Sequence, residues 1–475
     1  MSSPVDDIRR LLQLINSAAE NAIEQYESSG CGVPSINSTK IPDAPQDSLS
    51  LKRSLRILEG ACQQLIVTLM PPDLAMYTWS FAPGIDMACL RVIINANIPD
   101  LLTSYPDGLS VQEIGKKTGL EPSKLLRVLR NLAAKHCFRE IAEGVFLNNA
   151  LSLTLRSNQP VYSMAKLRAN RLHEHAFGRL WDTLSDPEYG HSDAVDKCAF
   201  AYGIKDEMPG GTLFTWLRDH PEYSKLFNQG MMILANVTNV PAVVKEFPWD
   251  KLPAGSTFCD VGAGIGTMPL ALAKKYDHIH YILQDTPNVV EHAQTVWGQQ
   301  NPAALSGGQV SFAPLDFFTE APLPGKDIYF LRQIIHDWTF ENCVKILKNV
   351  RKAMKPGSRV LINEYILPPP TFDKETNGLN GTNGANGTNG ANGHSQTVPI
   401  APKPLLPSYG AGATRTFLQD IAMLVLLNSQ ERTLAQLKEI GEASGLRFVK
   451  HWDLLEAGLV EFSRDDDFSR TQWDA

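Results

Sequence analysis

Hydrophobic positions recur with two different rhythms along the chain, and the change of rhythm divides it near residue 250. Before that point they return every three or four residues, which is typical of amphipathic helices. After it, short β-branched and aromatic runs alternate with helical segments, a pattern typical of a mostly parallel sheet with helices on both faces. The sequence therefore predicts a doubly wound, Rossmann-like α/β fold that follows an N-terminal helical part.

The second half contains the predicted sheet. Strands are expected at residues 257–261, 279–284, 309–314, 327–332 and 359–366. Helices are expected at 267–276, 287–299, 338–354, 412–427 and 433–444, and two further strands at 446–450 and 458–463. Residues 377–393 repeat Asn and Gly, and a Pro-rich run continues to residue 407. Because such a composition buries little, we expect a disordered surface insertion at about 373–407.

The N-terminal half begins with an amphipathic helix at residues 5–27, which must lie against another surface, such as a partner subunit. Residues 28–47 are rich in Ser, Pro, Gly and Asn and are typical of a linker.

A helix-turn-helix pattern follows. Ser110 and Glu113 form a capping box that opens a short helix, and Gly119 ends it. Pro122 can open a second helix, and a strand follows near Gly144. This order of elements resembles a winged helix-turn-helix.

Bulk composition excludes several classes of function. The net charge of −7 argues against general affinity for nucleic acid or anionic membranes. The seven cysteines are scattered without a Cys-x-x-Cys pair, which argues against a zinc site or a disulfide framework. The N-terminus lacks an apolar signal core, and the longest apolar run, 421–427, is far shorter than the about 20 residues that span a bilayer. We expect a cytoplasmic protein with no metal, nucleic-acid or membrane partner.

A glycine-rich turn marks the end of the first predicted strand. Asp260, Gly262, Gly264 and Gly266 lie in Phe-Cys-Asp-Val-Gly-Ala-Gly-Ile-Gly, between that strand and a helix. Glycines let the backbone turn tightly and approach a ligand closely. The same pattern occurs in nicotinamide dehydrogenases and, less informatively, in plain strand-to-helix turns.

Acidic residues follow the next two strands. Asp285 could accept hydrogen bonds from ribose hydroxyls, although it could instead cap the helix that begins near Pro287. Asp316 could reach an adenine amino group, and Phe317 could cover the ring. The ordered set favours a nucleoside-containing cofactor.

One histidine and two carboxylates lie beyond these motifs. His336 follows the fourth strand, Glu364 ends the fifth, and Glu431 lies after the insertion. An imidazole can take a proton from a hydroxyl near neutral pH, and neighbouring carboxylates would fix its tautomer and stabilise the imidazolium. There are also non-catalytic alternatives. His336 could be a structural histidine next to Asp337 as the N-cap of the following helix, and Glu431 could be a surface charge beside Arg432.

Together these motifs resemble the plant-type O-methyltransferases of the caffeic-acid and flavonoid group, and more closely their fungal relatives in polyketide pathways. The resemblance covers residues 80–465 and rests on segments 260–266, 284–287, 331–338, 363–368 and 420–433. It implies an O-methyltransferase that moves a methyl group from S-adenosylmethionine to a phenolic hydroxyl of a small aromatic, polyketide-type acceptor and leaves S-adenosylhomocysteine.

The resemblance also implies roles for single residues. It makes His336 the catalytic base with Glu364 and Glu431 beside it. It assigns cofactor contacts to Asp260, Gly262, Gly264, Gly266, Asp285, Asp316, Phe317 and Arg332, and substrate contacts to Met231, Met423 and Asn428. Arg332 stands where the plant enzymes have lysine, which keeps the charge but not the geometry.

The resemblance implies a homodimer, and it has no counterpart for the N-terminal 45 residues. The sequence divides into an N-terminal helix and linker at 1–47, a winged-helix-like dimerisation domain at 48–160, a helical connector at 161–245 that contributes to the substrate pocket, and a cofactor-binding catalytic domain at 246–475. Two other functions stay open from the residues alone, a nicotinamide-dependent oxidoreductase and a non-catalytic winged-helix DNA-binding regulator.

Overall fold

The computed structural model describes residues 3–45, 48–237, 240–372, 394–395 and 397–466. The Asn-Gly repeat at 377–393, and with it most of the expected insertion, lies outside the described residues.

The main sheet contains the five parallel strands that the alternation predicts. They are β4 (Ser256–Val261), β5 (Ile279–Asp285), β6 (Val310–Pro314), β7 (Ile328–Arg332) and β8 (Arg359–Leu367). The antiparallel strands β12 (Ala457–Arg464), β11 (Leu446–Leu454) and the short β9 (His394–Ser395) continue from β8. The order is β6-β5-β4-β7-β8-β12-β11-β9, and the short β10 (Arg432–Thr433) pairs with β8. The two closing strands are longer than expected and form a hairpin.

Helices cover both faces of this sheet because successive side chains of a strand point to opposite faces. In β7, Ile328 and Phe330 pack on one face, and Tyr329 and Leu331 pack on the other. The first face is covered by α14 (Val240–Glu246), α15 (Thr267–Ala273), α16 (Pro287–Gln300) and α17 (Pro302–Ser306). The second is covered by α18 (Phe340–Ala353) and α20 (Leu434–Ala443). The predicted mixed, mostly parallel α/β architecture is confirmed.

The strand order brings the candidate residues to one edge. The first strand of the domain, β4, lies between β5 and β7, so the chain reverses its direction of winding there. Ligands of open α/β sheets bind outside the carboxyl ends of strands at such a point. The glycine turn follows β4 and His336 follows β7, and both therefore lie at this edge.

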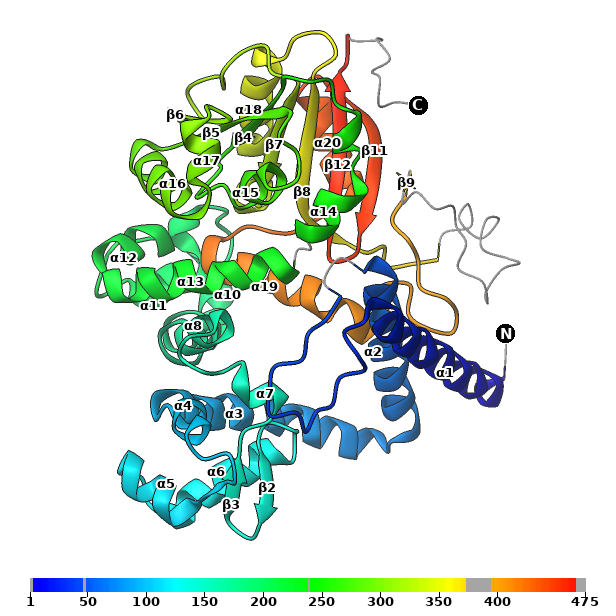
Figure 1. The fold of residues 1–475 in the computed structure, drawn as a ribbon, viewed down its shortest axis with the longest axis vertical. Helices are drawn as coiled ribbons and strands as arrows, with labels where there is room; N and C mark the ends of the chain where they lie inside the picture. Colours follow the sequence, from blue (N-terminus) through cyan, green and yellow to red (C-terminus); the bar gives the residue numbers. More distant parts are fainter. Residues whose placement is uncertain (1–2, 46–47, 238–239, 373–393, 396, 467–475) are drawn as a thin grey trace.

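The N-terminal helical part follows the predicted order of elements (Figure 1). It contains α2 (Leu49–Leu69), α3 (Pro72–Asn95), α4 (Ile98–Thr103), α5 (Val111–Thr118), α6 (Pro122–Ala133) and a three-stranded sheet of β1 (Leu109–Ser110), β3 (Val145–Leu147) and β2 (Arg139–Ala142). Ser110 caps α5 by accepting the N–H of Glu113 at 3.3 Å, and Gly119 ends α5 with φ +75°. The predicted helix boundaries here are confirmed.

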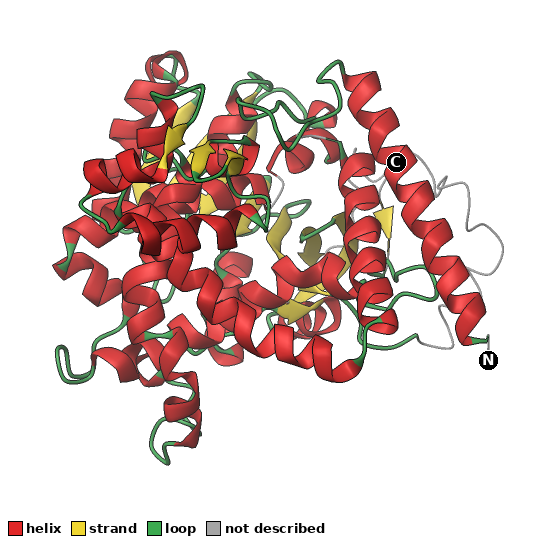
Figure 2. Cartoon of the chain, turned by 90° about the horizontal axis from the view of Figure 1, so that it is seen from below, coloured by secondary structure: helices red, strands yellow, loops and turns green. Residues whose placement is uncertain are grey.

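A group of short helices connects this part to the sheet domain. It includes α7 (Ala150–Leu153), α8 (Pro160–Leu167), α10 (Leu180–Ser185), α11 (Ala199–Ile204), α12 (Leu213–Asp219) and α13 (Pro221–Val237). Several of these helices share a hydrophobic core with α19 (Thr414–Leu427), which runs between them and the sheet in Figure 1. Seen from below, the molecule presents mainly helices, with the strands behind them (Figure 2). No helix in the described part of the chain is both long and apolar enough to span a membrane.

The N-terminal helix and the Pro-rich run differ from expectation. The helix α1 (Pro4–Ser29) packs against α2 of the same chain. Leu11 of α1 and Ala61 of α2 share a small core with Ala401 and Leu405. Residues 397–407 were expected to be disordered, but they hold two buried apolar side chains. Composition alone could not predict the burial of Ala401 and Leu405, because it depends on contacts with α1 and α2, which are far away in sequence.

Leu405 offers a direct test of this packing. Its side chain is 2% exposed, whereas that of Leu406 is 58% exposed. We expect Leu405→Ala to lower the free energy of unfolding by about 2–3 kcal/mol, because it leaves a cavity between helices and the run. Leu406→Ala is the matched control and should change it by less than about 0.5 kcal/mol. Urea unfolding measures both, and equal effects would contradict the packing.

Candidate active site

His336, Glu364 and Glu431 lie on three separate segments at the edge of the sheet. His336 lies in η5 (Ile335–Asp337), a single 3-10 turn that is separated from β7 by two residues. Glu364 lies within β8, the neighbouring strand, and Glu431 directly precedes β10, which pairs with β8. Pairing of the strands therefore brings together residues that are up to 95 positions apart in sequence.

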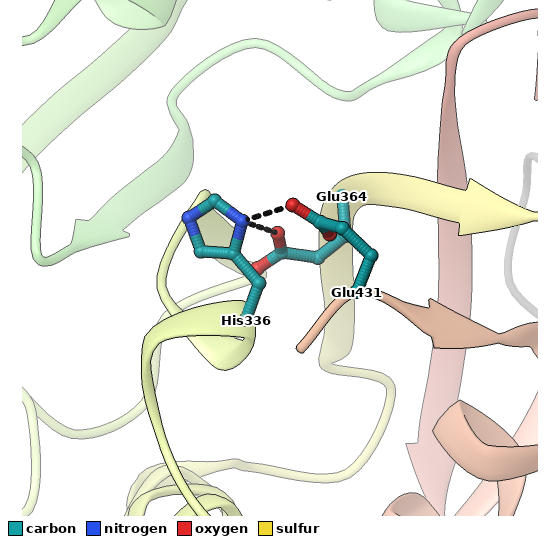
Figure 3. Close-up of side chains that lie close together, drawn as sticks. All are labelled: His336, Glu364 and Glu431. Atoms are coloured by element: carbon teal, nitrogen blue, oxygen red, sulfur yellow. Dashed lines mark hydrogen bonds and ion pairs between the residues drawn. The ribbon is translucent and has the colours of Figure 1, made fainter. Parts of the chain in front are cut away.

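Both glutamates contact the imidazole of His336 at Nδ1 (Figure 3). Its Nδ1 lies 2.7 Å from Oε1 of Glu431 and 3.7 Å from Oε2 of Glu364. All three side chains are buried. In Figure 3, Nε2 points away from both glutamates, so the ring presents its second nitrogen in the opposite direction. The structure thus brings together the three residues that the sequence predicted as a set.

Glu364 is fixed by the backbone of the histidine turn. Its Oε1 accepts the N–H groups of Ile334 and Ile335 at 2.9 and 2.8 Å. The preceding residue, Gln333, has a left-handed backbone with φ +55°. That conformation turns the chain after β7 so that two successive amides face one carboxylate. Glu364 consequently supports the turn and the imidazole together.

Charge and burial act against each other in this cluster. Burial lowers the pKa of His336, but the charges of Glu431, Glu364 and Asp337 outweigh it and raise the pKa above its ordinary value. Burial also raises the pKa of Glu364, although the positive imidazolium opposes this shift. Both shifts favour protons inside the cluster. A proton taken up by Nε2 would therefore be stabilised.

Asp337 is a further acidic neighbour of the imidazole, for which the sequence had left open a role as helix cap. The sequence left open that it caps the following helix, but the N-cap of α18 is Thr339, whose hydroxyl accepts the N–H of Asn342. The carboxylate of Asp337 instead lies 3.4 Å from Nε2 of His336. Burial raises the pKa of Asp337 to about 6, with His336 acting in the opposite sense. The one sign of this contact in the sequence was the position of Asp337 directly after His336.

The glycine turn after β4 has the geometry of a ligand cradle. A Cβ added to Gly264 would meet no atom within 4 Å, so the backbone there borders open space. A Cβ on Gly262 would lie 2.5 Å from Cδ1 of Ile334, and one on Gly266 would lie 2.3 Å from Cδ2 of Leu283. All three glycines have positive φ, and larger residues would be both strained and crowded at Gly262 and Gly266. The turn therefore fits a ligand that approaches its backbone closely.

Asp285 stands beside this cradle and does not serve as a side-chain cap. Its Oδ2 accepts the N–H of Gly264 at 2.9 Å, and its Oδ1 accepts the N–H of Thr286 at 2.7 Å. The N-cap residue of α16 is Thr286. A carboxylate has about four acceptor positions, so Asp285 keeps capacity for the hydroxyls of a ribose.

The remaining predicted cofactor residues lie around the same turn. Asp260 is buried, and burial raises its pKa to about 8 although Arg332 opposes the shift. Arg332 ends β7, and its pKa is lowered by burial, whereas the charges of Asp260 and Glu364 oppose this shift. Asp316 is exposed and accepts the N–H of Phe318 at 3.0 Å. The half-buried Phe317 packs against the core of the sheet near Gly262.

The three predicted substrate residues are placed differently from one another. Met423 on α19 is buried in the core that α19 shares with the connecting helices. Asn428 ends α19 with φ +55°, and its side-chain amide donates to the carbonyl of Ala194 at 3.0 Å and to that of Ser192. Met231 is half-buried on α13. Asn428 thus anchors a connecting loop to the segment that leads to Glu431.

The triad has the composition of a metal site as well as that of a proton site. Ligand atoms of His336, Glu364 and Glu431 lie within 4.8 Å of one another. The 2.7 Å separation between Nδ1 and Oε1 is that of a charge-assisted hydrogen bond. This contact indicates a shared proton between the two groups.

Comparison with known proteins shows that the chain is similar to O-methyltransferases. The chain matches the O-methyltransferase domain family over residues 189–394. The 3-O-methyltransferase 2 of Phanerochaete chrysosporium is 38% identical, over 95% of this chain and 96% of its own. The 4-O-methyltransferase 1 of the same fungus is 29% identical, over 94% and 95%.

Solved structures show the same fold. The structure of LepI in complex with SAM aligns with a TM-score of 0.64, 20% sequence identity and coverage of 86% of this chain and 94% of its own. The mitomycin 7-O-methyltransferase MmcR aligns with a TM-score of 0.60 and 22% identity, over 85% and 98%. At these identities the likeness extends to the fold alone.

Removal of one charge tests the electrostatics of the triad. Glu431→Gln keeps the size of the side chain and an oxygen that can accept from Nδ1, but it removes the largest influence that raises the pKa of His336. We expect the pKa of His336 to fall, so that the neutral ring persists to lower pH. Histidine NMR with labelled protein measures the shift. Glu442→Gln, at an exposed position on α20, is the control, and an unchanged His336 pKa in Glu431→Gln would refute the assignment.

Proposed function

The chain belongs to the O-methyltransferase family, and on this premise we propose that it methylates a phenolic hydroxyl of a small aromatic metabolite with His336 as general base. The single observation that carries the proposal is the buried His336–Glu431 hydrogen bond, which leaves Nε2 directed away from both glutamates. The similarity to fungal 3-O- and 4-O-methyltransferases supports an oxygen acceptor.

S-adenosylmethionine is the proposed methyl donor. The glycine turn, with its open side at Gly264, and the spare acceptor capacity of Asp285 fit its amino-acid part and ribose. Asp316 and Phe317 would hold the adenine, and Asp260 and Arg332 complete the buried polar wall. When bound, the sulfonium supplies a methyl group that can leave without a metal. We also propose that Met231, Met423 and Asn428 shape the acceptor side, as the resemblance implies.

The residues of the chain handle the proton of the acceptor. A phenol, with a pKa of about 10, is a weak nucleophile until its proton leaves. Nε2 of His336 would accept that proton while the Nδ1–H donates to Glu431. Glu431 and Glu364 then stabilise the positive ring, which is why two buried carboxylates are useful on its far side. Asp337, 3.4 Å from Nε2, would help to orient the hydroxyl.

The two alternative functions receive less support. The curated relatives that cover nearly the whole chain are named O-methyltransferases, which disfavours a nicotinamide-dependent oxidoreductase. The second helix of the helix-turn-helix directs Leu125, Leu129 and Leu132 into the core. Two of the basic residues in that region are paired, Arg130 with Glu140 and Lys135 with Asp86. These features disfavour a DNA-reading helix.

We propose a homodimer that forms through α2 and α3. Tyr77, Trp79 and Phe81 of α3 are 63%, 74% and 56% exposed, and apolar neighbours extend this surface. The neighbours that are also exposed are Ile66, Val67, Leu69, Leu74, Met76 and Ile85. Large contiguous apolar surfaces of this kind mark interaction sites, and a second copy of the chain is the occupant that the family resemblance implies.

The proposed domains follow from this assignment. Residues 48–160 would form the dimerisation domain, 161–245 the connector and 246–475 the catalytic domain, after the N-terminal helix and linker at 1–47. The first helix of the second domain, α2, is tied to the catalytic domain by the Arg53–Asp453 ion pair at 3.1 Å. It would therefore link the dimer surface to the active-site domain.

Replacement of the base is the principal test of the proposed reaction. We expect His336→Ala to lower kcat by about 100- to 10,000-fold, because general-base catalysis contributes that much, while S-adenosylhomocysteine still binds. Turnover of labelled methyl donor is measured with a panel of hydroxylated aromatic compounds, and binding is measured by calorimetry. His280→Ala, at an exposed position on β5, is the control and should keep full activity. Wild-type turnover by His336→Ala would overturn the proposal.

A charge on α3 tests the homodimer. We expect Trp79→Glu to convert the protein to a monomer in analytical ultracentrifugation, because a carboxylate would be buried in the apolar interface. Trp181→Glu on α10 is the matched control, since Trp181 is 78% exposed but lies outside α2 and α3. A wild-type protein that sediments as a monomer, or a Trp79→Glu variant that stays dimeric, would contradict this interface.

A further inference from the structure

The turn that carries His336 is bound along its backbone by side chains from elsewhere. Arg432 donates through one guanidinium nitrogen to the carbonyl of Ile335 at 2.6 Å and through the other to the carbonyl of Trp338. The Sγ of Cys343 donates to the same two carbonyls at 3.2 and 3.4 Å. The carbonyls that flank His336 on either side are thus each held by two buried donors.

The carbonyl of His336 itself is bound as well. It accepts a hydrogen bond from the hydroxyl of Ser429, which lies three residues before Arg432. Glu431, between these two residues, binds the imidazole. Three side chains of the segment 429–432 therefore contact the turn. Glu431 binds the ring, Ser429 binds the carbonyl of His336, and Arg432 binds the carbonyls at both ends of the turn.

We propose that Arg432 is a positioning residue that fixes the His336 turn and the Glu431 carboxylate in one rigid unit. This inference rests on the proposed function, because it concerns where the base is held. The sequence assigned no role to Arg432, and its side chain is buried with only 3% exposure. A buried cation that binds two carbonyls has a structural cost that a surface arginine does not have.

The geometry explains why the residue is arginine. Its guanidinium is a planar fork that can reach two carbonyl oxygens at once, whereas the ammonium of lysine is a single point at the end of a flexible stem. The two carbonyls lie at the ends of a turn of only four residues, 335–338. A fork that spans both ends prevents the turn from opening. The ring then keeps its direction even though η5 is too short to be stable by itself.

The charge of Arg432 has a smaller role than its shape. The groups that shift the pKa of His336 are burial, Glu431, Glu364 and Asp337. We therefore expect loss of the fork to lower the rate of the chemical step without moving the pH at which the base becomes active. Glu431→Gln, in contrast, should lower the pH at which the base becomes active, because it removes a negative charge that raises the pKa of His336.

The experiment compares Arg432→Lys and Arg432→Ala in the full chain. The concentration of folded sites is first counted by S-adenosylhomocysteine binding, and kcat and KM are then measured per binding site over a range of pH. Because a misplacement of about 1 Å can cost about 100-fold in rate, we expect kcat to fall about 10- to 100-fold in both variants. The KM values and the pH midpoint should stay near those of the wild type, and millimolar guanidinium should restore part of the activity of Arg432→Ala.

Arg351→Ala is the matched control. Arg351 also donates to a backbone carbonyl, that of Gly445 at 2.7 Å, but it lies on α18 and outside the His336 turn. The Arg351→Ala variant should have a lower free energy of unfolding but an unchanged kcat per binding site. If the Arg432 variants fail to fold, Ser429→Ala removes one donor from the same turn and should lower kcat by a smaller factor.

Two outcomes would overturn the positioning role. One is wild-type kcat per site in Arg432→Lys and in Ser429→Ala while His336→Ala is inactive. The other is a fall in kcat that guanidinium does not reverse and that is accompanied by a shift of the pH midpoint. An active His336→Ala would instead refute the base itself. The two failures are therefore distinguishable.

Discussion

The hydrogen bond between Nδ1 of His336 and Oε1 of Glu431 is the interaction on which the site depends. At 2.7 Å between two buried groups, it is a charge-assisted contact in a poorly solvated setting. Burial of charge is costly unless each group is paired and hydrogen-bonded. The protein meets this cost with Glu364, which binds two backbone amides, and with the fork of Arg432 on the turn. The result is an imidazole whose Nδ1 is bonded to Glu431 and whose Nε2 points away from both glutamates, 3.4 Å from Asp337.

The topology of the sheet makes this arrangement possible. Parallel strands β4, β7 and β8 end at the same edge, so the glycine turn, His336 and Glu364 meet there without contact in sequence. Glu431 joins from a separate segment because β10 pairs with β8. The charge of Arg332 interacts with those of Asp260 and Glu364. The glycine turn and the proposed base therefore lie at one edge of the sheet.

Local patterns predicted the fold well because they report on each strand and helix separately. The five parallel strands and the cap at Ser110 follow from periodicity and turn residues. The triad could be predicted as a set from its order after the strands. By contrast, the packing of Leu405, the role of Asp337 and the clamp of Arg432 and Cys343 depend on partners distant in sequence. Periodicity carries no information about such partners, and the clamp on the His336 turn was therefore not predicted.

A crystal structure of the ternary complex with S-adenosylhomocysteine and a methylated or unmethylated aromatic acceptor tests the central claim most directly. The acceptor oxygen should lie about 2.6–3.2 Å from Nε2 of His336. It should also face the sulfur of the bound product along the line of methyl transfer, with Nδ1 still bonded to Glu431. An acceptor oxygen remote from Nε2, or an imidazole turned so that Nδ1 leaves Glu431, would contradict the role of His336 as base.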